Sequence, residues 1–223
     1  MTTQLKSNWL APALLLLLGS LNILFGAMQL DTIQQGPQPV PSAFTSSHYF
    51  AIPIPIVAHI VFGILFNLLG PLQFAPIIWQ RWPAWHRWSG RLLFVSGIFV
   101  GLTGLWMNHF YPAYGGFLKY SGVGLSSIGL IVSLIIALRA IRRRNVQQHK
   151  AWMMRAVALA LGPATQRVII LPLFFTLGGL TDLMIGLLIW TGFLINLAVA
   201  ERVIWRDREQ QALGVYPSSK KLA

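Results

Sequence analysis

Two short runs of the sequence carry most of the side chains that could do chemistry. They are His86-Arg87-Trp88-Ser89-Gly90-Arg91 and His149-Lys150-Ala151-Trp152-Met153-Met154-Arg155. Each begins with a histidine and a basic residue, and continues to a tryptophan, two further residues and an arginine. A neutral imidazole is a good ligand for haem iron, and two histidines from adjacent helices can hold a b-type haem between them. His86 and His149 therefore predict a shared site, with haem b as the cofactor that best suits it.

The basic residues of the two runs suit the same site, because arginine pairs readily with carboxylates. Arg91 and Arg155 are predicted to neutralise the haem propionates, or to bind another anionic ligand. The alternative is that both runs are purely interfacial. A histidine beside arginines at a membrane surface often contacts only lipid headgroups, while the arginine stems extend along apolar surface.

Two polar residues inside apolar segments are secondary candidates, because a polar group in hydrocarbon needs a partner. For His59 we expect a hydrogen bond to Asn67 or to a neighbouring helix, and an alternative is a second haem shared with His109. Arg167 is a cation in a segment without any acid, which costs at least about 2.5 kcal/mol on insertion scales. It predicts either an anion site or an ion pair with Asp182.

The elements that position these residues are membrane spans. Of the 223 residues, 55% are hydrophobic and only 10% are charged, whereas a soluble domain has about 25% charged residues. A span needs about 20 apolar residues. The sequence predicts an all-α, polytopic helical bundle in one domain over 1–200, with a core of four helices over about 53–177 and a tail over 201–223. The six predicted spans are about 8–29, 53–78, 89–109, 120–141, 151–177 and 179–200.

Lysine and arginine residues predict the orientation of the spans, because cytoplasmic loops carry an excess of both. Connections rich in lysine and arginine alternate with connections that have few of them through all six spans. Both termini are therefore predicted to be cytoplasmic, in a cell inner membrane. The net charge of +12 does not indicate nucleic-acid binding, since the bases flank apolar spans. Anionic lipid headgroups at the inner face are the predicted partners, and helices of other membrane subunits are a further candidate. The first outer connection, about 30–52, is rich in proline and is predicted to be irregular.

Several classes of chemistry have no basis in this sequence. It contains no cysteine, so a thiolate metal site or an iron–sulfur cluster is excluded. No span has an acid at mid-depth for a proton relay, and there is no phosphate loop, HExxH motif or GxSxG motif.

The two histidine runs, together with Gly70-Pro71-Leu72-Gln73-Phe74 and Arg167, resemble the bacterial and fungal membrane proteins filed as domain of unknown function 2306. The resemblance covers about residues 55–175 and implies the architecture but no particular activity. The chain is also loosely similar to six-helix transmembrane b-type cytochromes, whose four central helices each supply a haem-ligating histidine. The predicted span 120–141 has no histidine, which leaves the inner pair, His86 and His149, as the haem site that this second likeness implies.

These observations predict a membrane protein that binds haem b and transfers electrons, or a reductase, with its site at the cytoplasmic interface. The alternative is a non-catalytic accessory subunit of a larger membrane complex, which binds partner helices and anionic lipid.

Overall fold

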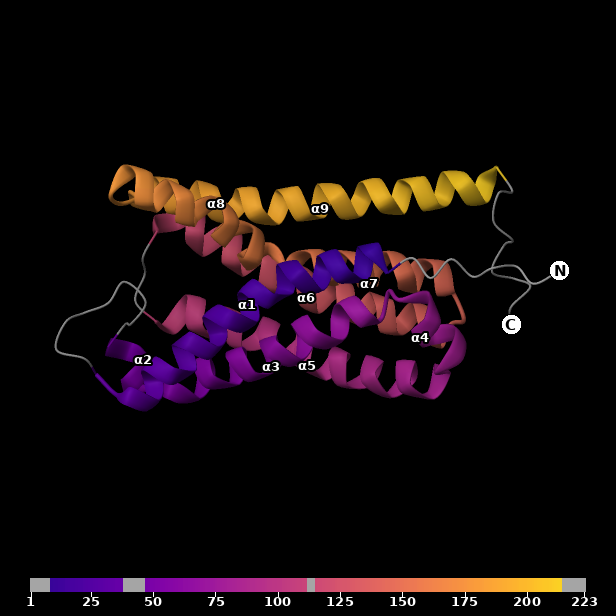
Figure 1. Ribbon diagram of the computed structural model, residues 1–223, viewed down its shortest axis with the longest axis horizontal. Helices are drawn as coiled ribbons and strands as arrows, with labels where there is room; N and C mark the ends of the chain where they lie inside the picture. Colours follow the sequence, from indigo (N-terminus) through magenta and orange to yellow (C-terminus); the bar gives the residue numbers. More distant parts are fainter. Residues whose placement is uncertain (1–8, 38–46, 112–114, 214–223) are drawn as a thin grey trace. The chain divides into compact units, whose positions relative to one another are not determined.

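The computed structural model describes residues 9–37, 47–111 and 115–213, and the secondary structure in these ranges is entirely helical (Figure 1). Six helical segments are long and apolar enough to cross a membrane. The predicted all-α, six-span fold is therefore confirmed, whereas the orientation of the termini stays a prediction. By its contacts the chain divides into two compact units, an N-terminal unit over residues 1–112 and a C-terminal unit over 113–223.

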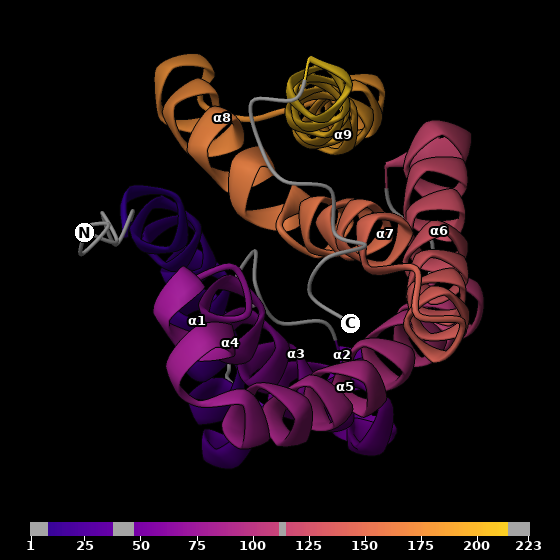
Figure 2. The ribbon, with the colours of Figure 1, turned by 90° about the vertical axis from the view of Figure 1, so that its right-hand side faces the viewer.

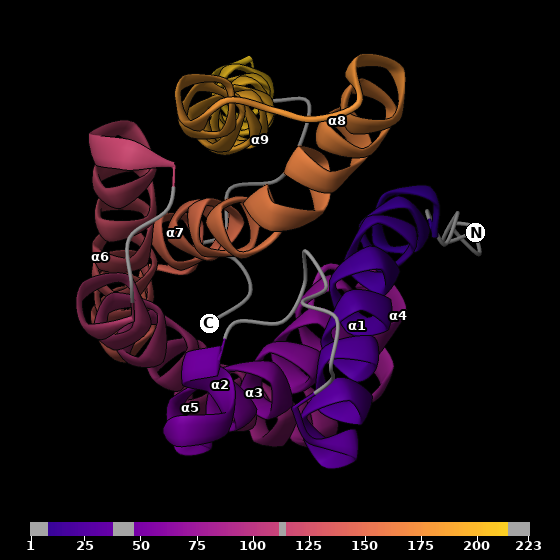
Figure 3. The same ribbon diagram turned by 90° about the vertical axis from the view of Figure 1, so that its left-hand side faces the viewer.

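The N-terminal unit is built on three long helices. Its five helices are α1 (Leu10–Gln35), α2 (Ser47–Ala51), α3 (Pro53–Leu72), α4 (Pro76–Arg81) and α5 (Pro83–Phe110). Helix α3 packs against α1 on one side and against α5 on the other (Figure 3). The core between α3 and α5 holds Phe66 and Leu93, which are fully buried.

Proline residues divide the basic end of this unit into separate helices. The predicted span 53–78 is interrupted after Leu72, and the short helix α4 begins at Pro76. Helix α5 begins at Pro83, six residues before the start of the predicted span 89–109. Proline suits the first turn of a helix, where its missing N–H has no partner to lose, but it does not continue a preceding helix. We call the region from α4 to Arg91 the basic end of the N-terminal unit.

Polar side chains join α1 to α3. Nδ2 of Asn22 donates a hydrogen bond to Oδ1 of Asn67 at 3.2 Å, and Nδ2 of Asn67 donates to the carbonyl of Gly63 at 2.8 Å. Gly19 lies against Asn67, where an added Cβ would be 3.3 Å from its oxygen atoms. Small residues and interhelical hydrogen bonds are the usual means of packing in lipid, where no hydrophobic effect drives helices together. Helix α1 is thus an integral part of this unit.

The C-terminal unit also spans three times. Its helices are α6 (Gly116–Arg142), α7 (Val146–Ala160), α8 (Gly162–Leu177) and α9 (Asp182–Ala212). Helices α6 and α7 form a hairpin, and α9 packs along α6, α7 and α8. The predicted span 151–177 is divided at Leu161, because Pro163 cannot donate to the carbonyl of Leu159. Figure 2 shows that α8 turns away from the direction of α7.

Helix α9 approaches α6 and α8 closely at glycine residues. An added Cβ at Gly186 would lie 2.6 Å from Cβ of Leu118 on α6. An added Cβ at Gly162 on α8 would lie 2.3 Å from the ring of Phe193 on α9. Since real Cβ atoms do not make contacts this short, both crossings require glycine. Helix α9 continues without interruption through residue 200 to Ala212, so the first part of the predicted tail is a helical extension of the last span.

The structure describes only part of the predicted outer connection, 30–52, and only part of the predicted tail, 201–223. Helix α1 continues to Gln35 and α2 begins at Ser47, so the predicted irregular connection over 30–52 is shorter than expected. Glutamine and isoleucine at 33–35 permit the helix to continue until Gly36, whose φ of 79° ends it. The rest of the proline-rich stretch, residues 38–46, and the end of the predicted tail, residues 214–223, lie outside the described residues.

Candidate functional site

His149 lies one turn inside α7 and is half-buried against α6. Its Nδ1 is 2.9 Å from the carbonyl oxygen of Ala137. A carbonyl oxygen can only accept, so Nδ1 carries the proton and, in the neutral ring, Nε2 carries the lone pair. Metal-ligating histidines commonly have this arrangement, in which one ring nitrogen donates to a carbonyl and the other binds the metal. The α6–α7 hairpin therefore holds the ring of His149 in a tautomer suited to ligation through Nε2.

Arg155 lies on α7 and binds the carboxylate of Glu201 on α9 with two hydrogen bonds. Nε is 2.5 Å from Oε1 and Nη2 is 2.9 Å from Oε2. The guanidinium carbon also lies 4.4 Å from the centre of the Trp152 ring, which is a cation–π contact. Arg155 thus has a carboxylate partner inside its own unit, and its predicted role toward a propionate or another anion would require exchange of Glu201 for that ligand.

The second basic residue of this run is also paired with α9. Nζ of Lys150 lies 2.5 Å from Oδ2 of Asp207. Glu201 and Asp207 are two of only five acids in the sequence. The sequence analysis did not assign them a role, although three acids near the end of the last helix could have indicated partners for the bases of the preceding inner connection.

His86 and Arg91 lie in the first part of α5, in the N-terminal unit. His86 is half-buried, and Arg91 is exposed. His149 and Arg155 lie in the C-terminal unit. The structure describes each unit by itself, so the convergence of His86 with His149 stays a prediction.

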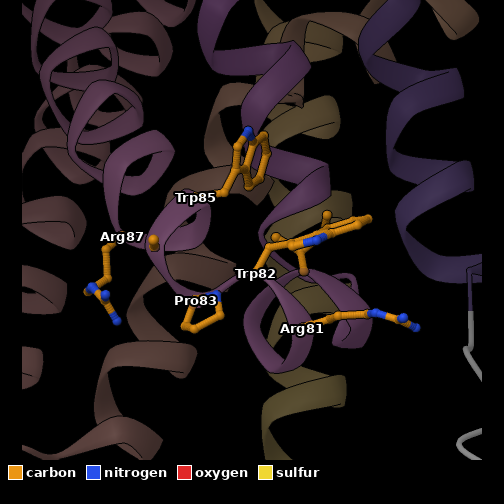
Figure 4. A pocket seen from close by; sticks show the side chains of 7 residues that line it. Arg81, Trp82, Pro83, Trp85 and Arg87 are labelled. Atoms are coloured by element: carbon orange, nitrogen blue, oxygen red, sulfur yellow. The ribbon is translucent and has the colours of Figure 1, made fainter.

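An open hollow lies at the basic end of the N-terminal unit, with a volume of about 620 Å³. In Figure 4, Trp82 and Pro83 lie between Arg81 and Arg87, whose side chains extend away on opposite sides. Trp82 is 52% exposed and Trp85 is 40% exposed. The residues that line the hollow are Ile78, Arg81, Trp82, Pro83, Ala84, Trp85 and Arg87.

His59, on α3, makes its hydrogen bond to α5. Its Nδ1 is 2.9 Å from Oγ1 of Thr103, whose hydroxyl is also 2.6 Å from the carbonyl oxygen of Phe99. Since the hydroxyl proton goes to that carbonyl, His59 is the donor toward Thr103. The expected bond to a neighbouring helix is confirmed, while Asn67 has other hydrogen-bonding partners. Thr103 lies six residues before His109 on α5, about 9 Å along the helix, so His59 and His109 lie at different depths.

Arg167 is half-buried on α8, close to other polar side chains. Its neighbour Gln166 donates to the carbonyl of Ile189 at 3.0 Å, and Thr165 donates to Oδ1 of Asn196 at 2.8 Å. Both of these bonds join α8 to α9. Asp182, the acid expected to pair with Arg167, accepts a hydrogen bond from the backbone N–H of Gly115 at 3.0 Å.

Within residues 9–37, 47–111 and 115–213, no three His, Asp or Glu side chains gather closely enough to hold a metal ion. Haem ligation does not depend on such a cluster, because it needs only one or two axial side chains.

One comparison with known proteins yields a match. The family model described as predicted membrane protein (DUF2306) matches residues 56–204, which is well over half of the chain. The matched region contains all six residues predicted for the site: His59, His86, Arg91, His149, Arg155 and Arg167. No curated protein and no solved structure matches the chain.

Proposed function

The chain belongs to the DUF2306 family of predicted membrane proteins, and on this premise we propose that it binds haem b in the membrane and transfers electrons. The single observation that carries the proposal is the environment of His149. Its Nδ1–H donates to Ala137 at 2.9 Å, and the ring is half-buried between two helices. The second axial ligand is the residue predicted from the sequence, His86.

The residues around His149 fit a haem in part. The imidazole has the protonation pattern that ligation requires, and the hydrogen bond to Ala137 fixes the ring orientation and increases its basicity. A bound haem b would supply one-electron transfer. Lys150 and Arg155, however, already have carboxylate partners. The propionates would therefore be neutralised more readily by the arginines near His86, such as Arg91, which has no acid nearby in the sequence.

Haem content and its dependence on His149 test the proposal. The full chain is purified in mild detergent from haem-replete cells, and haem is measured as the pyridine haemochrome per chain. We expect haem in the wild-type protein and in His109→Ala, since His109 is an exposed residue on α5, and its loss in His149→Ala. A haem-free wild-type protein would end the proposal, and so would equal haem content in all three proteins.

A second candidate function is that of a non-catalytic subunit that binds anionic lipid and partner helices. It is favoured by the basic end of the N-terminal unit, where Arg81 and Arg87 have no carboxylate within reach in the same unit. This candidate predicts a colourless protein that co-purifies with a defined membrane complex in mild detergent. A haem-containing protein isolated without partners would contradict it.

A further inference from the structure

The hollow at the basic end of the N-terminal unit combines two exposed cations with two exposed indole rings. Arg81 belongs to the last turn of α4 and Arg87 to the first turns of α5. The two guanidinium groups lie on opposite sides of Trp82 and Pro83, so the hollow is bordered by positive charge on both sides (Figure 4). The hollow, with its volume of about 620 Å³, is open rather than enclosed, so a group that remains attached to a larger molecule can enter it.

No acid of the N-terminal unit neutralises this charge. Among residues 1–112 the sequence has a single acid, Asp31. It lies 21 positions after the first residue of α1, which is about 30 Å along the helix at 1.5 Å per residue. Its carboxylate accepts a hydrogen bond from Gln35 at 2.7 Å. The arginines of the hollow therefore lack an internal counterion within their own unit.

In the C-terminal unit, the basic residues of the second histidine run have carboxylate partners. That run also begins in the first turn of a helix, but Lys150 and Arg155 are paired with Asp207 and Glu201 of α9. The N-terminal unit has no helix with acids at that end. The bases of one copy are thus paired within their own unit, whereas those of the other are exposed and can accept an anion from outside the unit.

The tryptophans indicate the source of that anion. Trp82 and Trp85 are half-exposed at the end of long apolar helices, and indole rings with this placement are typical of the headgroup region of a bilayer. Arginine binds phosphate oxygens through its planar fork of donors. We propose that the hollow and its two sides bind the headgroup phosphates of anionic phospholipids, with Arg81 as the phosphate-binding residue on one side, Arg87 on the other, and Trp82 packed beside the glycerol and upper acyl region.

Native mass spectrometry of the full chain in detergent tests this proposal, with phosphatidylglycerol as the anionic probe and phosphatidylcholine as the zwitterionic one. The variant is Arg81→Gln/Arg87→Gln. Its charge-matched control is Arg142→Gln/Arg143→Gln, at the exposed end of α6 in the C-terminal unit. A third variant, Arg81→Lys/Arg87→Lys, retains the charge and shows whether the guanidinium fork is needed.

We expect phosphatidylglycerol to bind the wild-type protein in preference to phosphatidylcholine, and the double glutamine variant to bind it about 30-fold more weakly, about fivefold for each arginine. The control should bind phosphatidylglycerol nearly as well as the wild type, because Arg142 and Arg143 do not line the hollow. The lysine variant should retain part of the binding. Equal binding by the glutamine variant and the wild type would overturn the proposal, as would an equal loss in the control. Competition by millimolar inorganic phosphate would also overturn it, since that result would indicate a site for free phosphate instead of lipid.

Discussion

Replacing Glu201 with alanine removes the carboxylate that connects α9 to Arg155 on α7. The Arg155 side chain is only 18% exposed and makes two hydrogen bonds to Glu201, which is 51% exposed. Hydrogen bonds to charged groups contribute about 1.5–3 kcal/mol when buried, whereas fully exposed ion pairs contribute about 0.2–1 kcal/mol. This pair lies between the two cases, so we expect a coupling free energy of about 1–2 kcal/mol between Arg155 and Glu201.

A double-mutant cycle isolates that coupling. The free energy of unfolding is measured for the wild type, Arg155→Ala, Glu201→Ala and the double variant, by circular dichroism of the full chain in mixed micelles of mild and denaturing detergent. A matched cycle combines Glu201→Ala with Arg142→Ala, because Arg142 is exposed at the end of α6. The first cycle should give the coupling stated above, reduced by added salt because Glu201 is partly exposed, and the second should give none.

A coupling below about 0.4 kcal/mol in the first cycle would refute the reasoning, since independent sites already add within that margin. The loss of the Trp152 contact in Arg155→Ala does not affect this conclusion. It occurs in both the single and the double variant, so it cancels in the cycle. The measurement therefore reports the ion pair itself.

Three further predictions concern packing and charge in the two units. The ion pair between Lys150 and Asp207 is more exposed, so the same type of cycle should give a coupling below about 1 kcal/mol, and a larger value would contradict the exposure of this pair. Gly162→Ala should destabilise the chain by about 1–3 kcal/mol, because the new Cβ would meet a phenylalanine ring of α9 at 2.3 Å. The control Gly63→Ala, where no atom lies within 4 Å of the new Cβ, should be neutral or stabilising by up to about 1 kcal/mol. Equal effects of the two substitutions on unfolding in detergent would refute this prediction. Asn67→Ala should cost about 0.6–1.7 kcal/mol through the lost bond to α1, and unchanged unfolding would show that this bond contributes nothing.

The number and approximate position of the six spans followed from the sequence because apolar runs of about 20 residues have few alternatives in a chain with so little charge. The ends of the helices were less predictable. Hydropathy does not register that the chain is interrupted after Leu72, where Pro76 starts a separate helix, because the residues on both sides of the interruption, as far as Ile78, are mostly apolar. The division at Leu161 was foreseeable from Pro163, which has no N–H, but its consequence for the direction of α8 depends on packing against α9.

The candidate site was predictable as a set of residues but not as a set of contacts. The histidines were recognisable because imidazole in an apolar chain needs a partner. Their partners, Thr103 for His59 and the carbonyl of Ala137 for His149, depend on which helix faces which. Glu201 lies 46 positions from Arg155. The acids near the end of the last helix could have indicated partners for the preceding bases, but a single sequence does not show that Arg155 pairs with Glu201 in particular.

The reduced-minus-oxidised absorption spectrum of the full chain, purified from haem-replete cells, tests the central claim most directly. Because His149 presents Nε2 for ligation, the account predicts the α-band of a low-spin b-type haem that is lost in His149→Ala. A flat spectrum from correctly folded wild-type protein would contradict it.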